Sequence, residues 1–481
     1  MNNFIVGRQA ELSELTSLLE TKKANLVVFM GRRRIGKSTL ARFFGKKHFK
    51  TFLEFSGLAP RGKQTNQEQL DHFSQQMMEQ TGWKGLQFKN WEEAFLALHK
   101  MTSKEKVFIL LDEVSWMGGL DPDFSGKLKV AWDTHFSSNK NLFMVLCGSV
   151  TSWIEENILF KADFVGRISA EFRLKELPLN ELKGFWRNKI AHLSSKELTH
   201  VLMVAGGVPR YLEEFRINTS SEQEIARLCF RRTGFLFNEY EKIFSEIFQK
   251  KSDTYRKIVE KIIDGPLTAM QIAKKLKITL NRDLSRYLYI LEISGFLNRE
   301  YTYSKDFKKT KLSRYRLSDN YLRFYLKYIQ PNRDQIELGT FSIQSVQQLH
   351  QWNTWSGFLF ENLILNHRLE VIEKLQIPKE LVVSASPYFQ VKKTRNKGAC
   401  QIDLLIQQKK DTLYVCEIKH KECIDKSVIK EVQAKIEKLE KKKGISVRPV
   451  LIYQGRLQDE DLLREYFDKL LSMDEILELQ S

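Results

Sequence analysis

Cysteine is scarce in this sequence. Its five cysteines, Cys147, Cys229, Cys400, Cys416 and Cys423, are scattered along 481 residues. Their odd number and irregular spacing argue against a disulfide framework, and none of them has the spacing of zinc ligands. We therefore expect a reducing compartment and predict a cytoplasmic protein.

Long apolar segments are also missing. No run approaches the roughly 18–20 apolar residues that a membrane-spanning helix needs, and the opening MNNFIVGRQAELSEL has no basic segment followed by an apolar one. We therefore expect no secretory signal and no membrane partner. With 42% apolar and 28% charged residues, the composition is that of a globular protein, and the length allows two to four domains.

Acidic residues are too few to balance the basic ones. The formal net charge is +18, and it comes from two stretches, residues 250–316 with 17 basic and 7 acidic residues and residues 389–450 with 16 and 8. Such an excess favours a polyanionic partner, and we expect nucleic acid, with DNA preferred. The alternative is a set of solvated helix faces in a generally basic protein.

The first third contains a phosphate-binding pattern. The apolar run NLVVFM (25–30) predicts a strand, and GRRRIGKST (31–39) follows it with the spacing G-x-x-x-x-G-K-[ST]. The glycines allow backbone N–H groups to surround a phosphate, Lys37 reaches the outer phosphates, and Ser38 ligates Mg²⁺. We expect Arg32, Arg33 and Arg34 to be mainly exposed and not catalytic.

Two further strands support this prediction. VFILLDEVSW (107–116) is typical of a buried parallel strand that ends in two carboxylates. Asp112 is expected to hold Mg²⁺ through water, and Glu113 to polarise the attacking water. NLFMVLCGS (141–149) ends in Ser149, a candidate sensor of the γ-phosphate, although a polar residue at a strand end is common in any protein.

FIVGRQAELSELTSLL, GRRRIGKST, LLDEVSW, GSVTSWI and GGVPRYL together resemble the archaeal-type ATPase family, on the STAND/AAA+ side of the P-loop NTPases. The resemblance covers about residues 1–330 and implies a P-loop ATPase domain (1–171) with a helical lid (172–248). It also implies switch-like ATP hydrolysis and nucleotide contacts from residues 6–8 and from Gly207 and Pro209. A homo-oligomer is a further option that it implies. Arg167 matches a candidate arginine finger, with a structural arginine as the alternative. The ATP-binding residues expected in all are Gly31, Arg34, Ile35, Gly36, Lys37, Ser38, Thr39, Asp112, Ser149 and Pro209.

Residues 249–335 predict a winged helix-turn-helix. Helices are expected over 254–264, 267–278 and from 282 to Gly295, followed by two β-type stretches joined by the basic loop SKDFKKTKL. The residues expected to contact nucleic acid are Arg282, Arg286, Lys308, Lys309 and Lys311. Winged helices also bind proteins, so this alternative stays open.

Residues 345–481 change to an α/β pattern. A helix is expected over 355–375, a strand over 387–393, a hairpin QIDLLI…TLYVCEIK, a helix over 427–443 and a strand over 448–455. This order, with Asp403 before the turn and Glu417-Ile418-Lys419 after it, resembles the restriction-endonuclease-like PD-(D/E)xK fold. Glu361 and Gln433 match further positions of that fold, whereas Ile402 stands where a proline is usual.

The chemistry expected of this hairpin is phosphodiester cleavage. Asp403, Glu417 and Glu361 offer the hard oxygen ligands that Mg²⁺ prefers, and alternation along a strand puts Lys419 on the same face as Glu417. The alternative is a solvent-facing alternation of charges. The sequence thus predicts an ATP-controlled, Mg²⁺-dependent nuclease or, alternatively, an ATP-dependent regulatory protein whose C-terminal domain only binds DNA or a partner.

Overall fold

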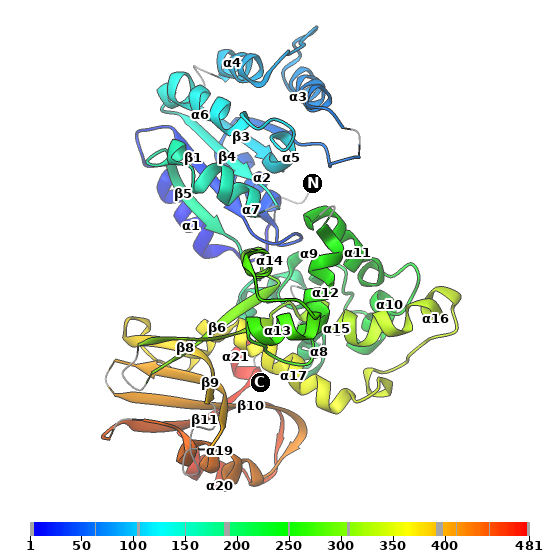
Figure 1. The fold of residues 1–481 in the computed structure, drawn as a ribbon, viewed down its shortest axis with the longest axis vertical. Helices are drawn as coiled ribbons and strands as arrows, with labels where there is room; N and C mark the ends of the chain where they lie inside the picture. The colour runs from blue at the N-terminus through cyan, green and yellow to red at the C-terminus, as the bar shows by residue number, and fades with distance from the viewer. Residues whose placement is uncertain are drawn as a thin grey trace. The chain divides into compact units, whose positions relative to one another are not determined.

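The computed structural model describes residues 4–62, 64–102, 106–149, 151–186, 193–248, 251–304, 308–390, 398–409, 411–441 and 443–478 (Figure 1). The chain forms two compact units. The first comprises Met1–Glu176, Ile243–Ser252 and Tyr289–Gly295, and the second comprises Leu177–Lys242, Asp253–Leu288 and Phe296–Ser481.

The first unit is built on a five-stranded parallel sheet in the order β2-β3-β4-β1-β5. Its strands are β1 (Asn25–Met30), β2 (Thr51–Ser56), β3 (Val107–Asp112), β4 (Leu142–Cys147) and β5 (Ile168–Arg173). The predicted strands at 25–30 and 141–149 are confirmed, whereas the strand predicted over 107–116 ends at Asp112, because Val114–Met117 form the short helix α5. Strand β5 ends at Arg173, two residues past the expected domain boundary at residue 171.

Helices cover both faces of this sheet, and all six residues of its strand β1 are therefore buried. Leu26 and Val28 pack into one core with α3, α4 and α6, while Val27 and Phe29 pack into a second core with α1 and α2. Because side chains alternate along a strand, both faces need apolar residues, which makes the run continuous. The helices are α1 (Gln9–Leu18), α2 (Lys37–His48), α3 (Asn66–Thr81), α4 (Trp91–Thr102), α5 (Val114–Met117), α6 (Phe124–Thr134) and α7 (Thr151–Ile154).

The middle of the chain is mainly helical, as predicted. Its helices are α8 (Ser195–Ala205), α9 (Pro209–Leu212), α10 (Ser221–Cys229), α11 (Phe235–Phe248), α12 (Ser252–Ile262), α13 (Ala269–Leu276), α14 (Arg282–Ile293), α15 (Asn320–Phe324) and α16 (Arg333–Leu338). An antiparallel pair, β6 (Leu297–Tyr303) and β7 (Lys309–Leu317), follows α14. The three helices before this pair lie where the sequence predicts them, whereas 305–307 of the predicted basic loop fall outside the described residues.

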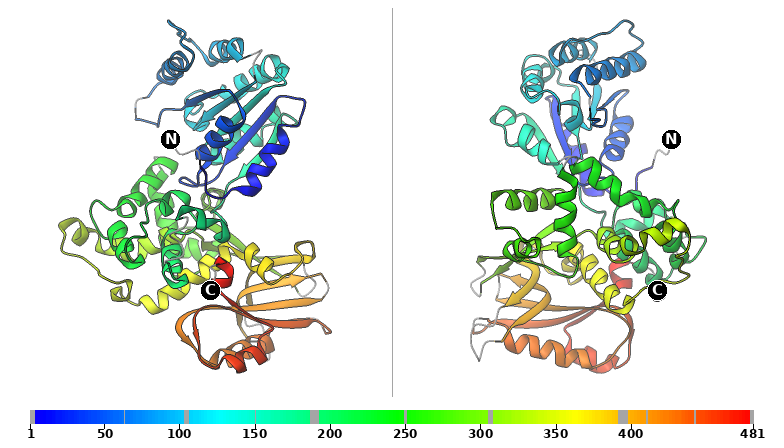
Figure 2. Two further views of the ribbon diagram at one scale, coloured as in Figure 1. Left: turned by 180° about the vertical axis from the view of Figure 1, so that it is seen from behind. Right: turned by 45° about the vertical axis from the view of Figure 1, so that its right-hand side comes forward.

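The C-terminal part carries a second five-stranded sheet, in the order β12-β11-β10-β9-β8. Strands β8, β9 and β10 pair antiparallel, and β11 and β12 continue parallel to β10. The strands are β8 (Val382–Gln390), β9 (Cys400–Gln408), β10 (Thr412–Ile424), β11 (Ser446–Leu457) and β12 (Lys469–Ser472), and the helices are α17 (Trp352–Asn366), α18 (Arg368–Lys374), α19 (Ser427–Lys438), α20 (Glu460–Tyr466) and α21 (Met473–Leu477). Figure 2 shows α19 and α20 against one face of this sheet, where they share an apolar core with it.

The predicted order of C-terminal elements is confirmed, with three local corrections. The helix expected over 355–375 is interrupted at His367, the helix expected over 427–443 ends at Lys438, and β8 begins five residues earlier than predicted. Residues 391–393 of the predicted strand fall outside the described part of the chain. All five cysteines are free. Among the described residues, no helix combines the length and apolar character that crossing a bilayer requires.

Candidate functional sites

The loop between β1 and α2 depends on its two glycines. Gly31 has a φ of 137°, and a Cβ placed there would lie 2.4 Å from the carbonyl oxygen of Leu174. Gly36 has a φ of 90° immediately before α2 begins at Lys37. Both positions therefore favour a residue without a side chain, and the loop delivers its backbone N–H groups to the N-terminus of a 12-residue helix.

Lys37 is buried at the centre of this loop. Its ammonium group donates to the carbonyl oxygens of Gly31 at 2.9 Å and Arg32 at 3.0 Å, and to the Ser149 hydroxyl at 3.2 Å. Burial lowers the pKa of the Lys37 ammonium, because a low-dielectric surround disfavours the charged form. The loop and the end of β4 thus meet at one lysine, as the sequence predicts for a phosphate site.

Two carboxylates at the end of β3 complete this first site. The Ser38 hydroxyl donates to Asp112 at 2.8 Å, and the Arg42 guanidinium lies 3.2 Å from the same carboxylate. Glu113 accepts hydrogen bonds from the Ser149 backbone N–H at 3.0 Å and its hydroxyl at 2.8 Å. Ser38 and Asp112 bring together a hydroxyl and a carboxylate, oxygen donors of the kind that Mg²⁺ prefers, and Glu113 is oriented by Ser149.

Arginines fix the loop from outside. The Arg8 guanidinium donates to the carbonyl oxygens of Ile35 at 2.8 Å and Lys175 at 2.7 Å. Arg32 is 5% exposed and lies 3.8 Å from Glu176, so the expectation that it would be exposed is wrong. Arg33 and Arg34 are half-buried. A buried arginine needs partners, and a loop that folds back on itself supplies them in carbonyl oxygens.

The remaining residues predicted for ATP lie at different places. Ile35 is buried in the core beside α2, whereas Thr39 is exposed. Pro209 begins α9 in the second unit. Arg167 donates through two nitrogens to Asp133, at 2.6 and 2.8 Å, and these hydrogen bonds lower the pKa of Asp133 to about 2. The candidate arginine finger is therefore held in an ion pair within its own unit.

The five residues predicted to contact nucleic acid all lie on the surface. Arg282 and Arg286 are exposed on α14, and Lys308, Lys309 and Lys311 are exposed at or near the start of β7. The ammonium group of Lys309 lies 3.5 Å from the ring centroid of Tyr301. Exposure leaves these five side chains accessible to a partner, which is the condition that contact with a phosphate backbone requires.

A second cluster of charges lies on the C-terminal sheet. Asp403 on β9 accepts a hydrogen bond from the Ile418 backbone N–H at 2.9 Å, and Glu417 on β10 is 2% exposed. The Lys419 ammonium lies 2.9 Å from Glu417, which confirms that the two share a face. Burial, together with the charges of Glu417 and Glu361, raises the pKa of Asp403 above its usual range. Burial likewise raises the pKa of Glu361 on α17.

Lys435 on α19 belongs to this cluster and was missed by sequence reasoning. Its ammonium group contacts Glu417 and lies 3.6 Å from Asp403. Gln433, predicted for this helix, is exposed and is not brought to the carboxylates. Glu431 and Lys435 are four residues apart, so they share a face of the helix, and they contact Lys419 and Glu417 respectively. Gln433 is two residues from each of them and therefore points in a different direction.

The oxygen donors suit Mg²⁺ chemically, but their arrangement is not that of a formed metal site. No group of three or more His, Cys, Asp or Glu residues positioned to hold a metal ion is present in the described part of the chain. The Lys435 ammonium group lies where it neutralises Glu417 and Asp403. A metal ion at these carboxylates therefore requires Lys435 to withdraw.

The first unit defines the class of protein. A parallel sheet whose first strand leads through a glycine loop into a helix, with a lysine, a serine and two carboxylates at the strand ends, is the arrangement of a P-loop ATPase. Comparison with known proteins agrees with this class. Residues 5–215 match an ATPase domain found predominantly in archaea. Residues 5–215 are therefore similar to archaeal ATPase domains, in agreement with the P-loop arrangement of the first unit.

Two further matches are to proteins without an assigned role. Residues 325–436 match a family of archaeal and bacterial proteins of unknown function. An uncharacterized protein of Methanocaldococcus jannaschii is 28% identical over 429 residues, which cover 88% of this chain and 89% of that protein.

Two solved structures are similar to parts of this chain. The Walker-type ATPase PABY2304 of Pyrococcus abyssi has a TM-score of 0.50 and 19% identity, over 67% of this chain and 96% of that one. The ORC2 protein of Aeropyrum pernix has a TM-score of 0.42 and 14% identity, over 70% and 97%.

Proposed function

We propose that this protein is an ATP-controlled nucleic-acid-processing enzyme. In this proposal the P-loop domain binds and hydrolyses ATP with Mg²⁺ and acts as a switch. The helices α12–α14 with the β6–β7 pair act as a winged helix that holds DNA, and the C-terminal domain cleaves a phosphodiester.

The charge cluster on the C-terminal sheet carries the proposal. Lys419 and Lys435 contact Glu417, Lys435 lies 3.6 Å from Asp403, and the charge of Glu361 acts on Asp403. Burying three carboxylates together is costly, as the raised pKa values of Asp403 and Glu361 indicate. Carboxylates with perturbed pKa values gather at functional sites, and metal-dependent phosphate chemistry is one use of such a cluster.

Each side chain has a role in the proposed reaction. Asp403, Glu417 and Glu361 would hold Mg²⁺, which when bound lowers the pKa of its water and offsets charge on the phosphate. Lys419 would orient the attacking water or stabilise the scissile phosphate. The Ile418 backbone N–H donates a hydrogen bond to Asp403, which holds this carboxylate beside the segment of β10 that carries Glu417 and Lys419.

A non-cleaving C-terminal domain is the second candidate. It is favoured by the ion pairs that Lys435 makes with Glu417 and Asp403, because they satisfy the carboxylates without a metal. In that case ATP would regulate the binding of DNA or a protein partner, and the chain would act as a scaffold.

A cleavage assay separates the two candidates. Supercoiled, linear and single-stranded DNA would be incubated with the protein and Mg²⁺ or Mn²⁺, with and without ATP. We expect cleavage that is lost in Asp403→Ala and Lys419→Ala and kept in Glu437→Ala and Lys430→Ala, which remove exposed charges from α19. If no substrate is cut with either metal, the nuclease proposal is rejected and the scaffold remains.

A further inference from the structure

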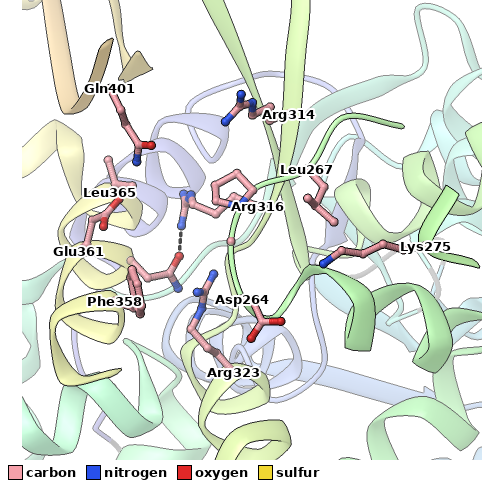
Figure 3. Close-up of a pocket in the computed structure, with 13 residues that line it drawn as sticks. Asp264, Leu267, Lys275, Arg314, Arg316, Arg323, Phe358, Glu361, Leu365 and Gln401 are labelled. Carbon is pink, nitrogen blue, oxygen red and sulfur yellow. Dashed lines mark hydrogen bonds between the residues drawn. The ribbon is translucent and has the colours of Figure 1, made fainter. Parts of the chain in front are cut away.

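The second unit contains a cavity of about 390 Å³ beside the proposed nuclease site (Figure 3). Its walls come from the connection between α12 and α13 and from α13, β7, α15, α17 and β9. Glu361 belongs to this wall and also to the carboxylate cluster. The cavity and the cluster therefore meet at one glutamate.

Cations dominate the charged side chains of the wall. Lys275, Arg314, Arg316 and Arg323 face two carboxylates, Asp264 and Glu361. Arg316 is already neutralised, since it lies 3.0 Å from the buried Glu300 and also donates to Asn362. Figure 3 shows this hydrogen bond and the nearby guanidinium groups of Arg314 and Arg323.

Arg323 and Arg314 form no ion pair with any described carboxylate, although the charges of Glu361 and Asp264 act on Arg323. Arg323 is 4% exposed and donates to the carbonyl oxygens of Ile263 and Leu317, both at 3.1 Å. Arg314 lies over the ring of Phe389, at 4.1 Å from its centroid. The Nε atoms of both arginines are buried and have no hydrogen-bond partner among the residues that the structure describes. Guanidinium groups kept in this way favour an anion with several oxygens.

We propose that this cavity binds one nucleotide of a DNA strand, with its phosphate on Arg314 and Arg323. The volume exceeds that of a phosphate alone and suits a phosphate with its sugar and base. Phe358, an aromatic side chain that is 40% exposed, lies at the wall and offers its ring to the base. This inference rests on the proposed function. Because the cavity and the carboxylate cluster share Glu361, the next phosphodiester of the bound strand would lie near Asp403 and Glu417.

The decisive variants remove charge from the wall without touching its buried ion pair. Arg314→Gln removes a guanidinium group, and Lys275→Gln removes an exposed ammonium group from α13. Two controls match them. Arg464→Gln removes an exposed arginine from α20, and Lys274→Gln removes the lysine next to Lys275, which does not line the cavity.

Binding is measured by fluorescence anisotropy of a labelled DNA strand in EDTA, so that no cleavage occurs. We expect Arg314→Gln to weaken binding about tenfold, the value of one charge-assisted hydrogen bond. The slope of log K against log salt should fall by about 1. Lys275→Gln should weaken binding less, and both controls should bind like the parent. Thermal melting checks that each variant is folded, and the exposed Lys275 provides a test if Arg314→Gln does not fold.

The outcomes for the cavity and for the nuclease are distinct. If Arg314→Gln and Lys275→Gln bind like their controls, or if the parent binds no DNA, the cavity proposal is overturned. Cleavage by a protein whose DNA binding ignores Arg314 and Lys275 would leave the nuclease proposal intact. Weakened binding in both variants with no cleavage by the parent would support the cavity and reject the nuclease. Competition by a nucleoside monophosphate as strong as that by the strand would identify a free-nucleotide site and overturn the inference.

Discussion

At the scale of single residues, burial determines which charges this protein tolerates. Lys37 and Lys435 are both surrounded by protein, yet burial lowers the pKa of Lys37, while nearby Asp403 and Glu417 raise that of Lys435 against the effect of burial. The Nδ1 atom of His420 lies 3.1 Å from the Ser356 hydroxyl. Its ring lies 6.0 Å from that of His200, and burial, with the charges of His200 and Lys196, lowers the pKa of His420 to about 4.

The low pKa of His420 predicts a loss of stability in mild acid. Between about pH 6.5 and pH 4 the unfolded chain binds a proton at this position and the folded chain does not. The free energy of unfolding therefore falls as the pH is lowered, by up to about 3 kcal/mol from this group. In His420→Gln the decrease measured by urea unfolding at pH 7 and pH 5 should be smaller. The exposed His350→Gln is the control, and an equal decrease in both variants would contradict the prediction.

At the scale of elements, the sequence predicted the strands of the first unit well because both faces of that sheet are covered. Fully buried strands such as Val107–Asp112 appear as unbroken apolar runs. The ATP site was predictable for the same reason, since its residues follow those runs at fixed spacing. Less could be said of the second site. Lys435 is one of several lysines on α19, and no pattern distinguishes the one that faces Glu417 from those that face water. Likewise the break at His367 has no glycine or proline to announce it.

The turn into α2 gives a prediction at this scale. Gly31→Ala should destabilise the first unit by about 1–3 kcal/mol, because the new methyl group would meet the Leu174 carbonyl oxygen and the backbone would be strained. Gly126→Ala in the first turn of α6 meets no atom within 4 Å and should stabilise by up to about 1 kcal/mol. Melting temperatures of both variants test the contrast, and equal shifts in the same direction would contradict it.

At the scale of the whole molecule, the chain forms two compact units, and the phosphate-binding loop lies in the first. The effect of ATP on thermal unfolding therefore reports on the stability of the first unit. We expect a calorimetric scan to show two transitions, and ATP with Mg²⁺ to raise mainly the transition of the first unit, which contains the phosphate-binding loop. At a ligand concentration of 100 times Kd the gain is about 2.7 kcal/mol. Lys37→Ala should abolish this shift and ATP turnover, whereas Lys47→Ala, at the exposed end of the same helix, should keep both. Unchanged turnover in Lys37→Ala would show that the loop is not the nucleotide site.

The distribution of thiols adds a built-in reporter of opening. Cys147, Cys229, Cys400 and Cys416 are buried, and only Cys423 is partly accessible. A thiol reagent should therefore label the native protein mainly at Cys423, and further labelling would mark the opening of the chain around each buried cysteine. Because Cys147 lies in the first unit and the other four in the second, peptide mapping of the label distinguishes which unit has opened. The order in which the cysteines become labelled would thus give the order in which the two units unfold, without adding any cysteine to the chain.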